Sequence, residues 1–151
     1  MRKIALEEHF NAPVFSGKLP DLFNPEILRT IEERLPEFNE QRLQAMDAGG
    51  VDITVLSQTS PGVHQLSHRQ AAIEAAQSCN DFLAKQISHH PSRYRGFACV
   101  PLQDPQAAVL ELERCVKEFG FLGALVNGHT GGNYLDAPEF SPFWAMLEEL
   151  Q

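Results

Sequence analysis

The sequence predicts an α/β fold built from four strand–helix units. Four apolar segments of strand type, residues 3–10, 51–57, 94–100 and 123–127, are each followed by a segment with helical periodicity. Such alternation is typical of a parallel, curved sheet whose strands are joined by right-handed crossovers. With 151 residues, 43% of them hydrophobic, we expect a single domain over residues 1–151. Four units can form either a small doubly wound sheet or about half of a TIM-type (β/α)8 barrel with outer helices.

The first strand ends in two acids and a histidine, where a doubly wound nucleotide-binding sheet would carry a glycine-rich turn. This favours half a barrel, in which the chemistry lies at the carboxyl ends of the strands. Side chains two positions apart on a strand share a face, so Glu7 and His9 could converge on one divalent cation while Glu8 faces away. Carboxylate and imidazole ligands suit zinc or manganese, but two are too few to hold a metal ion. A strand end exposed to solvent is the alternative interpretation.

A long irregular connection follows the first strand, from Asn11 to about Asn24, and is interrupted by Pro13 and Pro20. Loops of this length are uncommon in a compact domain unless they fold over a site. We therefore interpret residues 11–24 as a lid.

Cap signals mark the beginnings of two helices. Asn24 before Pro25 has the pattern of an N-cap and a first helical residue, and Asp104 before Pro105 repeats it. Together with apolar residues at helical spacing, these signals predict five helices. The predicted helices cover residues 25–35, 39–48, 67–88, 105–119 and 142–150.

The second strand, residues 51–57, is β-branched and mostly apolar, which is typical of parallel strands covered on both faces. The fourth strand, residues 123–127, ends in Asn127, and a glycine-rich loop is expected after it. In a barrel, Glu7, His9, the turn after the second strand and Asn127 would gather at one end.

The composition narrows the class of partner. Twelve basic against twenty acidic residues give a formal net charge of −8 without a basic cluster, which argues against nucleic acid or an anionic membrane surface. A small-molecule partner is expected. No apolar run approaches the roughly 20 residues of a membrane span, and Cys79, Cys99 and Cys115 have the context of reduced core residues. The cytoplasm is therefore the expected location.

Several short segments carry a family resemblance that covers essentially the whole chain. They are Ala5–Phe10, Val55–Ser57 with Pro61 and Val63, Asn80–Asp81, Arg93–Ala98, Pro101–Pro105, Gly120–Gly128 and Pro142–Trp144. In this order and spacing they resemble the amino-terminal half of the amidohydrolase-superfamily decarboxylases, in particular the γ-resorcylate and 2,3-dihydroxybenzoate decarboxylases.

The resemblance implies a (β/α)8 barrel that binds one divalent metal ion, zinc or manganese. It further implies a carbon–carbon lyase of aromatic acid catabolism, which removes carbon dioxide from a small hydroxybenzoate-type carboxylic acid. By this resemblance Glu7 and His9 match metal ligands on the first strand. Asn127 matches a polar residue near the substrate, and Phe23 matches a lid aromatic that covers the substrate ring.

The resemblance also implies that the proton donor and the remaining ligands lie on strands five, six and eight, so we expect no catalytic residue within 1–151. Three functions stay open: a decarboxylase present as its amino-terminal half, a metal-dependent hydrolase of the same superfamily, and a non-catalytic truncated half-barrel. Glu7 disfavours the hydrolase, since the hydrolases usually carry histidine at that position. Unpaired edges on the first and fourth strands predict a homo-oligomer or a complementary half-barrel chain.

Overall fold

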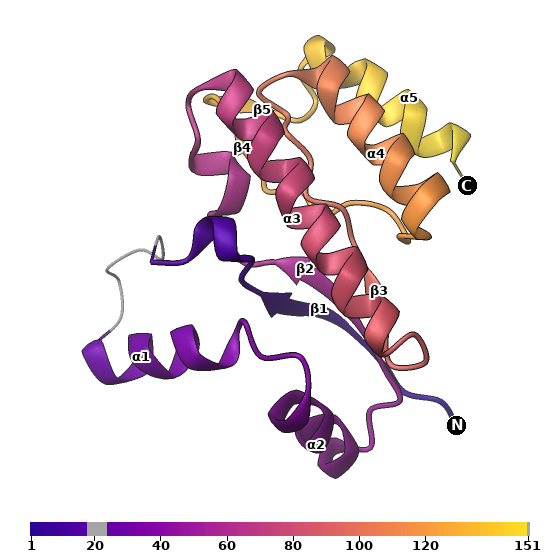
Figure 1. Ribbon diagram of the computed structural model, residues 1–151. Helices are drawn as coiled ribbons and strands as arrows, with labels where there is room; N and C mark the ends of the chain where they lie inside the picture. The colour runs from indigo at the N-terminus through magenta and orange to yellow at the C-terminus, as the bar shows by residue number, and fades with distance from the viewer. Residues whose placement is uncertain (18–23, 151) are drawn as a thin grey trace.

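Three parallel strands in the order β1–β2–β3 form the main sheet of the computed structural model, which describes residues 1–17 and 24–150 (Figure 1). The strands are β1 (Ile4–Phe10), β2 (Ile53–Gln58) and β3 (Tyr94–Gly96). The middle strand β2 is buried from Thr54 to Gln58, as predicted for a strand covered on both faces.

The described part of the chain also contains five α-helices. They are α1 (Pro25–Arg34), α2 (Glu40–Gly49), α3 (Arg69–His89), α4 (Pro105–Phe119) and α5 (Ser141–Glu149), with short 3-10 turns η1 (Pro13–Phe15), η2 (Gly62–Gln65) and η3 (Pro138–Phe140). Figure 1 shows α3, α4 and α5 side by side, with α3 in contact with both β3 and α4. Every helix within residues 1–17 and 24–150 is too short or too polar to cross a bilayer.

Both predicted helix caps are confirmed. The Asn24 side-chain oxygen accepts a hydrogen bond from the Ile27 amide at 2.9 Å. The Asp104 side-chain oxygen accepts one from the Ala107 amide at 3.1 Å. Each cap satisfies an amide that has no partner inside its own helix.

The prediction of a regular fourth strand over residues 123–127 is wrong. A single parallel bridge joins Ala98 to Ala124, and the Ala98 amide donates to the Gly123 carbonyl at 2.8 Å. Gly123, the first residue of the predicted strand, has a φ of +146°, outside the range of regular strands. The described part of the chain therefore has three parallel strands and one bridge in place of four strands.

The glycine-rich stretch predicted as a loop instead forms a small antiparallel hairpin. Its strands are β4 (His129–Thr130) and β5 (Asn133–Tyr134). The two residues between them, Gly131 and Gly132, have φ values of +59° and +86°, which a tight two-residue hairpin turn requires.

Asn80 connects three parts of the core. Its side-chain amide donates to the Cys99 carbonyl at 2.9 Å and to the Glu111 carboxylate at 2.7 Å, and its oxygen accepts from the Cys99 amide at 2.9 Å. Asn80 belongs to α3, Glu111 to α4, and Cys99 to the segment that follows β3. One buried side chain thus ties two helices to the sheet, because each of its hydrogen bonds satisfies a group that is cut off from water.

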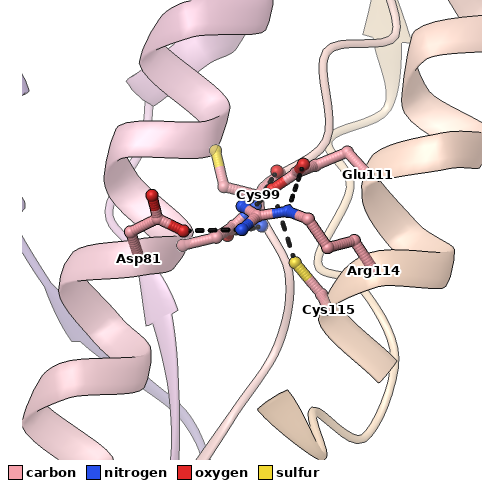
Figure 2. A network of polar contacts seen from close by, with 6 residues as sticks. Asp81, Cys99, Glu111, Arg114 and Cys115 are labelled. Atoms are coloured by element: carbon pink, nitrogen blue, oxygen red, sulfur yellow. Dashed lines mark hydrogen bonds and ion pairs between the residues drawn. The ribbon is translucent and has the colours of Figure 1, made fainter. Parts of the chain in front are cut away.

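The buried Glu111 is neutralised by Arg114 (Figure 2). The Arg114 guanidinium makes two hydrogen bonds to the Glu111 carboxylate, at 2.7 and 2.9 Å, and a third to Asp81 of α3 at 2.7 Å. The hydrogen bond with Glu111 raises the pKa of Arg114 above its usual value. A buried carboxylate without such a partner would be strongly destabilising.

The three cysteines are free and buried, which confirms their interpretation as reduced core residues. A hydrogen bond with Cys99, together with burial, raises the pKa of the Cys79 thiol. Burial is the main cause that raises the pKa of Cys115, whose sulfur also lies 3.5 Å from the Glu111 carboxylate. Thiols that stay protonated at neutral pH are poor nucleophiles, so Cys79 and Cys115 act in packing.

Replacing Asn80 with alanine should lower the free energy of unfolding by about 3 kcal/mol, because it leaves the buried Cys99 amide and carbonyl without partners and removes one hydrogen bond to Glu111. Urea denaturation followed by circular dichroism measures the change. Gln70→Ala is the matched control, since it removes an exposed hydrogen bond from a side-chain amide to Glu74 within the same helix. It should lower the free energy of unfolding by less than about 0.5 kcal/mol. Equal losses in the two variants would contradict the role of Asn80.

Candidate metal site at the carboxyl end of the first strand

His9 lies near the carboxyl end of β1, opposite Ser57 of β2. Its Nδ1 atom is 3.0 Å from the Ser57 hydroxyl oxygen, and Ser57 is completely buried. The backbone carbonyl of His9 accepts a hydrogen bond from the Arg42 guanidinium of α2 at 2.9 Å. Neighbouring elements thus hold both the ring and the backbone of His9, and in the described part of the chain no hydrogen bond engages its Nε2 atom.

Arg42 is itself held in place by backbone carbonyls. Its Nε atom donates to the Glu37 carbonyl at 2.9 Å, and its Nη2 atom also reaches the Leu35 carbonyl at 3.4 Å. Burial lowers the pKa of Arg42, while nearby acids, Glu8 among them, partly compensate. The guanidinium therefore fixes the end of β1 against the turn that precedes α2.

The register of β1 on β2 separates Glu8 from His9. Glu8 lies opposite Leu56, whose side chain belongs to the core between the sheet and the helices, whereas His9 lies opposite Ser57. Because successive side chains of a strand alternate between faces, this register predicts that Glu8 and His9 point to opposite sides of the sheet.

Glu7 lies in a bulge of β1. Ala5 pairs with Thr54 and Glu8 with Leu56, so β1 has one extra residue at this point, and Glu7 has a φ of +58°. A non-glycine residue in this conformation costs about 1–2 kcal/mol, and such strain clusters at functional sites. The regular alternation from which we expected Glu7 and His9 to share a face is therefore interrupted. Their convergence on one cation stays a prediction.

Glu7 and His9 have the right chemistry for a divalent cation. The Glu7 side chain is exposed, and within the described residues no hydrogen bond or ion pair engages its carboxylate. Together the two residues offer one carboxylate and one imidazole nitrogen, both common ligands of zinc and manganese. Over residues 1–17 and 24–150, no group of three or more histidine, cysteine, aspartate or glutamate side chains is placed to hold a metal ion.

Asn127 lines a small pocket beyond the ends of β2 and β3, together with Pro61, Val63 and His64. Burial, with a smaller contribution from His129, lowers the pKa of His64, so its ring is neutral at pH 7. Its Nδ1 atom is buried and has no hydrogen-bond partner among the described residues. A loop histidine is ordinarily solvated, and no signal in the sequence marks this one as part of a pocket wall.

The predicted lid can be followed only in part, because Phe23 lies outside the described residues. Its beginning is fixed to the end of β2 by Gln58, whose side chain accepts from the Ala12 amide at 2.9 Å and donates to the Asn11 side chain at 2.8 Å. Phe15 is buried in the core. The first part of the predicted lid is thus packed against the sheet.

Known proteins resemble this chain over nearly all of its length. It is 42% identical over 158 aligned residues to a γ-resorcylate decarboxylase of Polaromonas sp. (strain JS666 / ATCC BAA-500), an alignment that covers 98% of this chain and 47% of that protein. The chain therefore spans about half the length of the relatives it matches.

Solved structures agree with the sequence comparison. A 2,6-dihydroxybenzoate decarboxylase in complex with 2,6-dihydroxybenzoate superimposes with a TM-score of 0.92 at 39% identity, over 99% of this chain and 48% of that one. A dihydroxybenzoic acid decarboxylase of Polaromonas sp. JS666, with bound manganese and the inhibitor 2-nitroresorcinol, gives a TM-score of 0.89 at 40% identity, over 99% and 47% of the two chains. The family model described as amidohydrolase matches residues 8–151, so this chain belongs to the amidohydrolase family.

Proposed function

We propose that this chain is the amino-terminal half of a metal-dependent decarboxylase that acts on a hydroxybenzoate-type aromatic acid. The observation that carries the proposal is the 42% identity to a γ-resorcylate decarboxylase over 98% of the chain. In this proposal residues 1–151 form about half of a (β/α)8 barrel, with the site at the carboxyl ends of its strands. The substrate ring would lie between the β1 end and Asn127, under the predicted lid with Phe23.

Glu7 and His9 would hold the cation from the β1 side. Bound there, zinc or manganese would orient the phenolate and carboxylate of the substrate and stabilise their charge. The Asn127 amide can both donate and accept a hydrogen bond, so it could contact a ring hydroxyl or the carboxylate. We assign no proton donor within residues 1–151, because the family resemblance puts that residue on a later strand.

The proposal can be tested by supplying the second half of the barrel. Residues 1–151 would be fused to the carboxyl-terminal half of the Polaromonas γ-resorcylate decarboxylase. This chain aligns with 47% of that protein, and the fusion supplies the remaining part. With manganese present, the fusion should release carbon dioxide from 2,6-dihydroxybenzoate. Glu7→Gln and His9→Gln should each lower that rate, and the manganese content of the purified protein, by at least about 100-fold, because each removes a metal ligand.

Glu8→Gln is the matched control for this experiment, since it changes the same type of side chain at a position that pairs with Leu56 and not with Ser57. Its metal content and rate should stay within a few-fold of the parent fusion. Undiminished metal content in the Glu7 and His9 variants would contradict the ligand assignment. Lactone opening without carbon dioxide release would favour the hydrolase alternative.

The exposed edge of β1 supports a second part of the proposal, namely that this edge is covered by a complementary half-barrel or a second copy of the chain. β1 is the outer strand of the sheet, and its apolar residues Ile4 and Leu6 are 56% and 62% exposed. Unpaired strand edges with apolar side chains promote association.

Sedimentation velocity of the isolated chain should accordingly detect dimers or larger species at micromolar concentration. Leu6→Lys should shift the distribution toward monomer, because it puts a charge on the unpaired edge. Leu110→Lys is the control, since Leu110 is similarly exposed, at 61%, but lies on α4, away from the strand edges. A chain that sediments as a monomer at all concentrations would count against this part of the proposal.

A further inference from the structure

Whether His9 can bind a metal ion at the end of β1 depends on which of its two ring nitrogens is free to act as the ligand. Nδ1 lies 3.0 Å from the hydroxyl oxygen of Ser57, within hydrogen-bond distance. Nε2 has no such partner in the described part of the chain. The contact with Ser57 therefore distinguishes the two nitrogens, although they are chemically similar.

We propose that Ser57 is a positioning residue that fixes the His9 ring so that Nε2 is the nitrogen offered to a divalent cation. The inference rests on the proposed function, since it concerns how this chain prepares a metal ligand. The register puts Ser57 directly opposite His9, and its hydroxyl is the β2 group that contacts the ring.

A hydroxyl is suited to this position because it can reverse its role. It can donate to Nδ1 when the ring carries its proton on Nε2, and it can accept from Nδ1–H when Nε2 binds a cation. The same contact can therefore persist before and after metal binding. A backbone carbonyl in its place could only accept, and a methyl group could do neither.

The support is rigid on both sides of the contact. Ser57 is completely buried in the middle strand of the sheet, and the preceding residue, Leu56, accepts a hydrogen bond from the Phe97 amide at 2.9 Å. On the other side, Arg42 holds the His9 carbonyl at 2.9 Å. With the backbone held by Arg42, the ring orientation of His9 is left to its contact with Ser57.

Nitrogen-15 NMR of the isolated, metal-free chain tests the positioning directly. Ser57→Ala should shift the Nδ1 resonance of His9 and broaden its ring signals, because the ring loses the partner that orients it. Ser57→Thr keeps the hydroxyl and should restore the parent resonance. Thr54→Val is the matched control, since it removes another buried hydroxyl of β2, one that lies 3.8 Å from the Met46 sulfur. An Nδ1 resonance that is identical in the parent and Ser57→Ala would overturn the proposal.

Zinc titration of the metal-free fusion with the Polaromonas carboxyl-terminal half, in competition with a chromogenic chelator, gives the second readout. Ser57→Ala should weaken zinc binding by about 10- to 100-fold, and Ser57→Thr should recover most of the loss, as expected for residues that orient a metal ligand. Ser57→Ala binding as tightly as the parent would contradict the positioning role. If the parent fusion bound no zinc, the metal claim of the proposed function would fail, whereas the NMR comparison would still decide the role of Ser57.

Discussion

The pairing of β1 with β2 is the constraint on which the rest of this site depends. The register places His9 opposite Ser57 and Glu8 opposite Leu56, and a shift by one residue would exchange the faces of both. The bulge between Ala5 and Glu8 sets this register for the second half of β1. It does so with Glu7 in a left-handed conformation, which the surrounding structure has to stabilise. The pairing of β1 with β2 and the bulge in β1 therefore together determine the orientation of His9.

Side-chain amides fix the loops around this feature. Gln58 holds the beginning of the predicted lid, Asn80 holds the segment after β3, and Gln103 donates to the backbone carbonyls of Val63 and Leu66 at 2.7 and 2.8 Å. In each case a long-range hydrogen bond satisfies backbone groups that a loop cannot satisfy by itself. The loops beyond the strand ends are thus connected to the sheet and its helices. A polar site built on such loops has a rigid base.

Much of the fold could be predicted because its signals are local. Cap pairs such as Asn24–Pro25 mark helix starts, and the apolar run after Val51 marks a buried strand. The failures have local causes as well. Gly123 begins the predicted fourth strand in a backbone conformation outside the strand range, and the Gly131–Gly132 pair makes a hairpin turn between strands too short to recognise.

The site could be predicted only in part, because its geometry depends on long-range pairing. Glu7 and His9 were identifiable from their residue types and spacing, but the bulge at Glu7 was not, since nothing near it in the sequence requires a positive φ. The contact of His9 with Ser57 joins residues 48 positions apart, and register of this kind cannot be obtained from composition or periodicity.

The metal assignment can be examined in a manganese anomalous difference map from a crystal of the fusion with the Polaromonas carboxyl-terminal half, soaked in manganese chloride. We expect a single strong peak at the carboxyl end of β1, within coordination distance of both His9 Nε2 and a Glu7 carboxylate oxygen. A peak bound through Nδ1, or a Glu7 side chain that points away from His9 with no peak between them, would contradict it.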